Sequence, residues 1–280
     1  MRLFHLVVFG LNCCLGTALQ AEVTCDTQYG MVCIETVATS DTVTFYAENR
    51  HSLLPVTLSL DMNLTNLERK TGKDGAFVLS GQERIPLFVL QSIRSGPWRY
   101  NYEFSWSRGD ITARHTDTYR YRLPFETSSA VVVGQGCNGR FSHLGAQRYA
   151  VDFMMQIGTP ILAARDGRVV DIKEDSNRGG PDRYYEADGN YVIVQHDDRT
   201  LAQYFHLQKN GASVRLGQSV KRGDLLGYSG NTGRSTGPHL HFDVVTGSTG
   251  IESQTVPVTF ATPSGEISCP RQGARLTATH

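Results

Sequence analysis

The chain has 280 residues, with 27 Lys and Arg against 27 Asp and Glu, so its formal net charge is zero. A balanced charge leaves no electrostatic footprint for nucleic acid and no basic run for a membrane surface. The length suits one large domain or two modest ones, and the 40% of hydrophobic residues is enough to build a core.

The first 21 residues have the pattern of a secretory signal peptide. Arg2 precedes an apolar stretch that ends in small residues, which predicts cleavage after Ala21. A membrane anchor is disfavoured because the apolar segment is too short and too interrupted to span a bilayer. Lipidation at Cys13 or Cys14 is disfavoured because neither follows the small-residue box of a lipoprotein. We therefore expect an exported protein, periplasmic or extracellular, with no stable membrane insertion after cleavage.

The cysteines that remain after this cleavage are Cys25, Cys33, Cys137 and Cys269. An even number in an exported chain favours disulfides. Cys25 and Cys33 could close a small loop, and Cys137 and Cys269 would then bracket the C-terminal half. The other pairings stay open, because four cysteines allow three connectivities. A zinc site made of cysteines is disfavoured, since the sequence has no CxxC spacing.

Residues 22–126 alternate like β-strands in stretches such as DTVTFYAEN, LPVTLSLDM and RYNYEFSW, with turn residues between them. Short strands at this spacing predict a small antiparallel domain, sandwich-like or a barrel. His51 and His115 stand singly among polar residues and are interpreted as exposed bystanders. This region therefore carries no predicted catalytic group.

The composition changes near residue 127. Over residues 127–262, glycines recur at turn positions between short strands of period two, such as YVIVQH, and no long helical period occurs. This pattern predicts a second β-rich domain, followed by an irregular tail over residues 263–280. The expected fold class is mainly β, an antiparallel β-sheet domain preceded by a smaller β-sandwich-like one.

One stretch of the second domain, HLHFDV over residues 239–244, raises a question of chemistry. Along a strand, alternate side chains point to the same face, so His239 and His241 are predicted to share one face while Leu240 and Phe242 enter the core. Two imidazoles side by side on an open face favour a metal site over packing.

Further metal-binding side chains surround this stretch in the second domain: His143, Asp152, His196 and His206. Asp152 stands between two apolar residues, and a buried carboxylate needs a partner such as a dication. A zinc hydrolase needs three ligands of imidazole and carboxylate type, an open position for water, and a base. The set is sufficient for such a centre.

Residues 142–245 resemble the lysostaphin/LytM-type zinc endopeptidases, which cut peptides of bacterial cell-wall peptidoglycan. The resemblance is carried by SHLG and YAVDF, by GNYVIVQH and YFHL, and above all by GNTGRSTGPHLHF. It implies one Zn²⁺ per chain, with His143, Asp152 and His241 as ligands. It also implies that His206 and His239 flank the metal-bound water, one as base and then acid, without binding the metal.

The spacing between the first two implied ligands departs from the family pattern. Many members have three residues between the opening His and the Asp, whereas eight separate His143 from Asp152. Arg148 occupies the close-spaced position and cannot bind zinc, because its guanidinium is always protonated. A longer loop that returns His143 to the site is favoured over a different first ligand, because SHLG keeps its local context and Gly145 indicates a turn.

Other polar residues receive lesser roles. Tyr204, two residues before His206, is predicted to share its strand face and to support the tetrahedral intermediate. His196 follows a strand and is interpreted as structural or as support for a ligand. Asp166 and Asp188 precede glycines and are interpreted as turn residues.

The leading hypothesis is a zinc-dependent endopeptidase that hydrolyses peptide bonds of peptidoglycan, with peptidoglycan peptides as its partners and no nucleic acid. The alternative is a non-catalytic LytM-like protein that binds or regulates cell-wall enzymes. It is disfavoured because no ligand type is lost. A minor third hypothesis is a protease of proteins outside the cell wall, since the same chemistry cuts any accessible amide.

Overall fold

The computed structural model describes residues 6–12, 20–27, 29–73 and 75–278. Much of the predicted signal peptide over residues 1–21, including Cys13 and Cys14, lies outside the described residues. Leu6–Asn12 form strand β1, and β2 begins at Gln20. Cleavage after Ala21 stays a prediction. Within the described part of the chain, no helix has the length and apolar character to cross a bilayer.

Contacts within the chain divide it into two units. The first comprises the described residues up to Ile111 together with Gly247–Glu252, and the second runs over Thr112–Thr246 and from Ser253 onward. Antiparallel pairing dominates both units, which confirms the predicted mainly β fold class.

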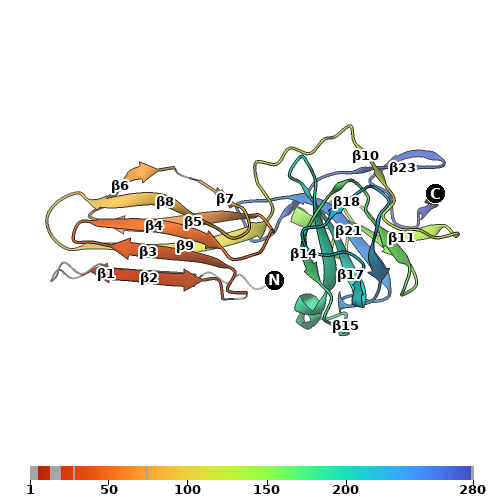
Figure 1. Cartoon of the computed structure of the whole chain (residues 1–280), viewed down its shortest axis with the longest axis horizontal. Coiled ribbons are helices and arrows are strands. Elements are labelled where there is room, and N and C mark those ends of the chain that lie inside the picture. Colours follow the sequence, from red (N-terminus) through yellow and green to blue (C-terminus); the bar gives the residue numbers. More distant parts are fainter. Residues whose placement is uncertain (1–5, 13–19, 28, 74, 279–280) are drawn as a thin grey trace. The chain divides into compact units, whose positions relative to one another are not determined.

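The first unit is built from strands of two sheets that share one core (Figure 1). One sheet has the order β1 (Leu6–Asn12), β9 (Trp98–Arg108), β5 (Val56–Thr65), β7 (Phe77–Leu79). The other has the order β2 (Gln20–Cys25), β3 (Val32–Ala38), β4 (Thr42–Asn49), β8 (Glu83–Ser92), β6 (Leu67–Gly72).

The core of this unit follows from the period-two pattern of its strands. In β4 every second side chain is buried, and Phe45 among them contacts rings of the opposite sheet. Its ring centroid lies 5.3 Å from that of Tyr100 and 5.5 Å from that of Tyr102, both edge to face. Edge-to-face aromatic pairs add to the free energy gained by burying the rings.

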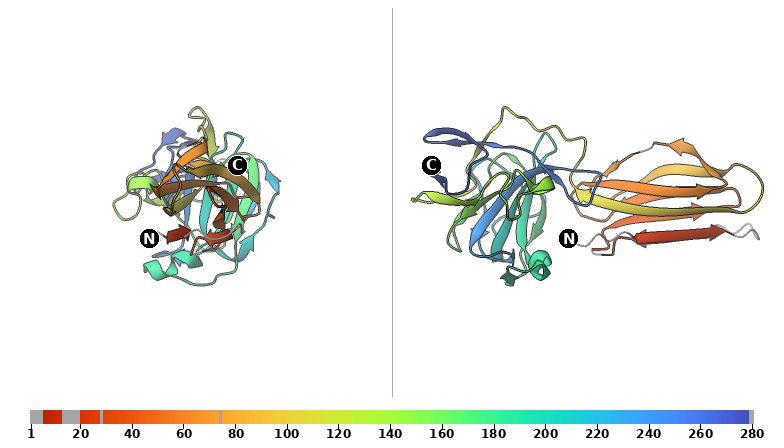
Figure 2. Two further views of the ribbon diagram at one scale, coloured as in Figure 1. Left: turned by 90° about the vertical axis from the view of Figure 1, so that its left-hand side faces the viewer. Right: turned by 180° about the vertical axis from the view of Figure 1, so that it is seen from behind.

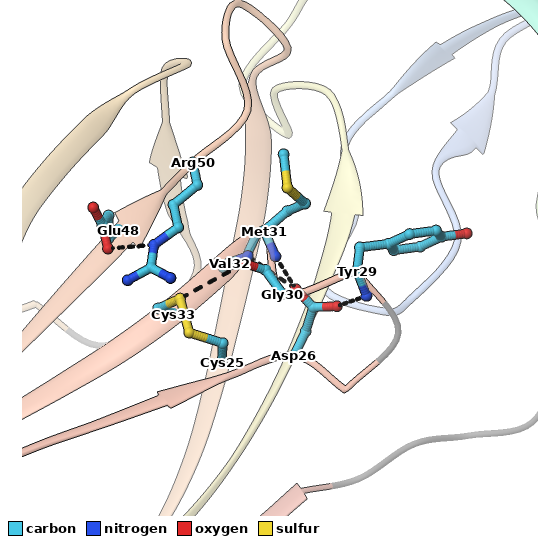
Figure 3. The surroundings of a disulfide bond; sticks show 9 residues. All are labelled: Cys25, Asp26, Tyr29, Gly30, Met31, Val32, Cys33, Glu48 and Arg50. Carbon is cyan, nitrogen blue, oxygen red and sulfur yellow. Dashed lines mark hydrogen bonds and ion pairs between the residues drawn. A yellow bond between two sulfur atoms is a disulfide. The ribbon is translucent and has the colours of Figure 1, made fainter. Parts of the chain in front are cut away.

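A disulfide joins neighbouring strands at the end of the β2–β3 hairpin (Figure 3). Cys25 and Cys33 stand opposite each other in register and are bonded. The carboxylate of Asp26 organises the turn between them, because it accepts hydrogen bonds from the backbone N–H groups of Tyr29, Met31 and Val32 at 2.7–2.9 Å. The prediction of disulfides is confirmed, here for the short loop.

The segment Gly247–Glu252 contacts strands of the first unit although β21 of the second unit precedes it. Ser107 Oγ donates a hydrogen bond to the Ser248 carbonyl oxygen at 3.0 Å and accepts one from the Ser248 N–H at 2.8 Å. A Cβ at Gly247 would lie 2.1 Å from the hydroxyl oxygen of Thr57, so only glycine fits there.

The second unit contains a long sheet with the order β18 (Ser219–Val220), β14 (Gly167–Lys173), β16 (Asn190–Gln195), β17 (Leu201–Ala212), β21 (His239–Thr246), β12 (Val151–Met154), β11 (Val131–Gln135), β25 (Arg275–Leu276). β19 (Leu225–Ser229) pairs with β17 and with β13 (Pro160–Leu162), and β22 (Gln254–Thr255) pairs with β21. Figure 2 shows β17 and β21 running side by side, as their register requires.

Smaller elements complete this unit. β10 (Arg120–Arg122) pairs with β23 (Thr259–Thr262), which pairs with β24 (Gly265–Ser268). β15 (Gly179–Gly180) pairs with β20 (Gly233–Arg234), and the 3₁₀-helices are η1 (Gly145–Gln147) and η2 (Arg183–Asp188).

The units divide at Ile111 and Thr112, not at the predicted boundary after residue 126. The reason is that Tyr121, Leu123 and Phe125 are buried in the core of the second unit. His115, predicted to be exposed, has a side chain only 7% exposed, and its Nε2 lies 3.1 Å from the Tyr121 hydroxyl.

The tail over residues 263–280, predicted to be irregular, contains β24 and β25. Leu276 is buried against the core of the second unit, and Cys269 forms a disulfide with Cys137. Strands this short depend on their partners, so the sequence pattern alone gave no signal for them.

Candidate metal centre

Strand β21 places the predicted pair of histidines as the alternation requires. Leu240 and Phe242 are fully buried in the core, while His239 and His241 lie on the opposite face. Asp152 of β12 stands directly opposite His241 in register. Residues directly opposite in an antiparallel pair share a face, so this carboxylate joins the histidines.

Three of the predicted residues converge on one point. One ligand atom from each of His143, Asp152 and His241 lies within 4.8 Å of the others. The Oδ1 oxygen of Asp152 lies 2.9 Å from His241 Nδ1 and 3.3 Å from His143 Nε2. His239 Nε2 is further away, at 3.8 Å from the same oxygen.

His143 reaches this point from the loop between β11 and β12, as the longer spacing led us to expect. Its ring is fully buried, and its Nδ1 donates a hydrogen bond to the Gly136 carbonyl oxygen at 3.0 Å. This leaves the lone pair on Nε2, which has no hydrogen-bond partner among the described residues. A buried nitrogen without a partner is costly, and a metal ion would satisfy it.

The loop that carries His143 is tied to the C-terminal segment. Cys137 is bonded to Cys269, which confirms the second predicted disulfide. A Cβ at Gly136 would lie 1.8 Å from the Pro270 carbonyl oxygen, so only glycine allows the two backbones to approach this closely. The carbonyl oxygen that holds the His143 ring therefore comes from a constrained stretch of backbone.

His241 has a second carboxylate behind it, which the sequence analysis missed. Its Nε2 lies 3.2 Å from Oδ2 of Asp243, a residue only 2% exposed. Metal-binding histidines commonly donate their other ring N–H to a carboxylate, which fixes the ring orientation. The available signal was the period of two in HLHFD, which puts Asp243 on the face of His241.

The electrostatics of the centre favour a cation. Burial alone would raise the pKa of Asp152, but the neighbouring imidazoles of His143 and His241 outweigh it and hold this pKa well below its ordinary value. Burial would lower the pKa of His241, yet Asp152 and Asp243 raise it to about 10. The carboxylates thus stabilise positive charge between them, and a divalent cation would supply it.

His206 and His239 lie together beside these residues, with ring centroids 4.5 Å apart. His206 Nδ1 donates to the Thr232 carbonyl oxygen at 2.7 Å, and His239 Nδ1 donates to the Gly237 carbonyl oxygen at 2.7 Å. Each ring therefore carries its free lone pair on Nε2. Burial lowers the pKa of His206 to about 3 and lowers that of His239, so both rings are neutral at pH 7.

Tyr204 does not share the strand face of His206, contrary to the prediction. Its side chain is fully buried in the core, and its hydroxyl accepts a hydrogen bond from the Ala164 N–H at 2.9 Å. The strand alternation changes between the two residues. Phe205 pairs with Tyr191 and Leu207 with Asn190, so His206 is the extra residue of a bulge, with φ of 67°. The bulge turns His206 away from the core side on which Tyr204 lies.

His196 does not belong to the group of residues at the candidate metal centre. It lies in a separate group of buried polar side chains of the second unit. Its Nδ1 lies 2.9 Å from the Thr200 hydroxyl, which donates to Asp198. Asp198 in turn binds Arg165 at 2.6 Å. This supports the structural interpretation. Asp166 accepts a hydrogen bond from the Arg222 N–H, which joins it to a distant segment of the chain.

The buried ring of His196 predicts a pH-dependent stability. Burial lowers its pKa to about 3, and the positive charge of Arg165 lowers it further, as does His115. The carboxylates of Asp198 and Asp166 act in the opposite direction but do not outweigh these effects. At a pH between this lowered pKa and the ordinary pKa of histidine, the unfolded chain binds more protons than the folded chain does. The free energy of unfolding therefore falls as the pH falls. Going from about pH 7.5 to about pH 5 should remove about 2 kcal/mol of unfolding free energy through this group.

Denaturant unfolding of the full chain and of His196→Gln at both pH values checks this. The variant should lose less stability on acidification than the wild type does. Equal losses in the two proteins would contradict the assignment.

Comparisons with known proteins agree with this geometry. The sequence model of peptidase family M23 matches residues 146–253. Peptidoglycan DD-endopeptidase ShyA of Vibrio cholerae is 42% identical over 100 residues, 36% of this chain and 20% of that protein. Lysostaphin of Staphylococcus simulans is 37% identical over 122 residues, 43% of this chain and 22% of that protein. The chain thus spans about a fifth of the length of these relatives.

Among solved structures, the catalytic domain of the prophage-encoded M23 protein EnpA from Enterococcus faecalis shares 27% identity, with a TM-score of 0.36. The match covers 48% of this chain and 92% of that one. The resemblance predicted from the motifs is confirmed by the family match, which includes Asp152, His206, His239 and His241. Residues 146–253, most of which belong to the second unit, therefore match the domain of peptidase family M23.

Proposed function

We propose that the second unit is a zinc-dependent endopeptidase that hydrolyses peptide bonds of peptidoglycan. The observation that carries the proposal is the convergence of His143, Asp152 and His241, with ligand atoms within 4.8 Å of one another. Two imidazole nitrogens and a carboxylate oxygen are the ligand types of catalytic zinc sites, which keep a further position open. The unpartnered, buried Nε2 of His143 fits this use.

Zinc held by these residues would supply a Lewis acid for the scissile carbonyl and would lower the pKa of water to roughly 7. Besides binding the metal, Asp152 would offset the positive charge of the cation within the buried site. Asp243 holds the His241 ring through Nε2, so that Nδ1 faces the centre.

His206 and His239 are the proton carriers in this proposal. The Nδ1–H of each ring is held by a carbonyl oxygen, so the tautomer is fixed and Nε2 is an acceptor. A neutral ring of this kind takes the proton of the attacking water and passes it to the leaving amine. Between these two transfers, while the ring holds the proton, its charge stabilises the negative charge that develops on the carbonyl oxygen.

The choice of peptidoglycan as substrate rests on the relatives and on the predicted export. ShyA, which is 42% identical to this chain over 100 residues, is named a peptidoglycan DD-endopeptidase. A signal peptide over residues 1–21 would deliver the enzyme to the compartment where peptidoglycan is found. Cys25–Cys33 and Cys137–Cys269 suit the same oxidising compartment.

Zinc analysis combined with digestion of purified sacculi tests the proposal. The full chain should bind one zinc ion, release peptide fragments from sacculi, lose this activity to a chelator and regain it with added zinc. A soluble protein offered beside the sacculi should stay intact. Hydrolysis that survives complete chelation would reject the proposal, and a zinc-free chain that binds a cell-wall enzyme would favour the non-catalytic alternative.

A further inference from the structure

Gln135 connects two of the residues proposed to bind the metal. It is the last residue of β11, is 8% exposed, and stands opposite Asp152 in register. Its Nε2 donates hydrogen bonds to Asp152 Oδ2 at 3.2 Å and to Ser142 Oγ at 2.8 Å. Its Oε1 accepts from the N–H groups of Phe141 and Ser142 at 2.9 and 3.0 Å. The amide therefore uses both donors and both acceptor positions.

The two oxygens of Asp152 thereby receive different partners. Oδ2 is held by Gln135, while Oδ1 faces the nitrogens of His143 and His241. A carboxylate held at one oxygen cannot rotate freely, so the other oxygen keeps its direction. Hydrogen-bonded partners of this kind are a common requirement of metal ligands.

The same side chain also fixes the loop that ends in His143. The backbone N–H groups of Phe141 and Ser142, directly before this histidine, both donate to Gln135. At Gly139 a Cβ would lie 2.2 Å from Cγ of Gln135, so the loop folds closely over the side chain only because that residue is glycine. One amide thus restrains both ends of the long spacing between His143 and Asp152.

A bulge in β11 brings Gln135 into this place. Val133 pairs with Phe153 and Gln135 pairs with Asp152, so Gly134 is the extra residue between them. Without the bulge, Gly134 would stand opposite Asp152 and no side chain would reach the carboxylate. Bulges often redirect a side chain beside a functional site.

We propose that Gln135 is a positioning residue of the metal centre, which orients Asp152 and the His143 loop toward one ion. This inference rests on the proposed function. It explains how a chain with eight residues between the first two ligands keeps them in one site, since the β11 side chain supplies a link that the local sequence lacks.

The test compares Gln135→Met and Gln135→Glu with Gln218→Met in the full chain. Gln218 is a matched control, because its Oε1 also accepts a backbone N–H, from Arg215, but at the sheet edge formed by β18. Met removes all four hydrogen bonds at Gln135. Glu keeps the two acceptor contacts to the loop but places an oxygen against Asp152 Oδ2, which separates orientation of the carboxylate from support of the loop.

Zinc affinity, measured by competition with a chromogenic chelator, is the main readout, and unfolding of the metal-free proteins is the second. Both Gln135 variants should bind zinc about 10- to 100-fold more weakly than the wild type, and Gln218→Met should not. Affinity at the wild-type level in either folded variant would overturn the inference. If both fail to fold while Gln218→Met folds, Gln135 is structural and the inference is likewise overturned.

The wild-type chain separates this result from the proposed function. One bound zinc ion and hydrolysis of sacculi by the wild type, with unweakened binding in the Gln135 variants, would refute the positioning role alone. A wild-type chain that binds no zinc would refute the proposed function and with it the inference.

Discussion

Asp152→Asn is expected to abolish both zinc binding and hydrolysis of peptidoglycan. Asparagine has nearly the same shape but no charge to offset that of the cation, and its amide nitrogen is a donor that cannot bind a cation. The loss of an outer hydrogen-bond partner already weakens metal affinity about 10- to 100-fold, so the loss of the ligand itself should exceed about 100-fold. Zinc content and the rate of sacculus digestion measure both effects.

Asp171→Asn is the matched control for this substitution. Asp171 lies in β14 of the same sheet and accepts a hydrogen bond from the Tyr191 hydroxyl at 3.0 Å. The same chemical change there should leave zinc content and hydrolysis close to wild type. If Asp152→Asn kept a full complement of zinc and wild-type hydrolysis, the three residues could not be the ligands.

Substitution of His206 or His239 by alanine should give a different result, in which zinc stays bound and hydrolysis is lost. Neither residue belongs to the set of converging ligand atoms, and each ring is fixed by a carbonyl oxygen with Nε2 free. Proton transfer by a positioned side chain contributes about 100- to 10,000-fold to a rate. We expect a fall in this range, seen as a lower kcat for sacculus digestion at unchanged zinc content.

His51→Ala in the first unit controls for the loss of an imidazole as such and should leave the rate unchanged. If zinc left together with activity in His206→Ala or His239→Ala, that residue would be a ligand. If the rate did not change, it would carry no proton in the reaction.

The local sequence pattern predicted the parts of the site that lie on one strand. The alternation of HLHF placed His239 and His241 on one face and Leu240 and Phe242 in the core. Asp152 between apolar neighbours indicated a buried carboxylate with a partner, which the structure provides. Such predictions succeed because the direction of a side chain along a regular strand depends only on parity.

The parts that the sequence left open depend on contacts between distant segments. The bulge at His206 arises from its pairing with β16, and it reverses the face expected for Tyr204. The bulge at Gly134 arises from its pairing with β12, and it brings in Gln135. One extra residue in a strand exchanges the two faces, and no local pattern announces it.

The segment Gly247–Glu252 has a practical meaning for any attempt to isolate the peptidase domain. The polypeptide passes from the first unit to the second after Ile111, returns after Thr246, and leaves again after Glu252. A protease that nicked the chain at the first passage would leave the two fragments without a covalent link, held together by contacts such as those of Ser107 with Ser248. Likewise, a truncated gene product starting at Thr112 would retain six residues whose hydrogen-bonding partners, such as Ser107, had been deleted. Those orphaned residues directly follow the strand that bears His239 and His241, so an inactive fragment would not by itself argue against the enzyme.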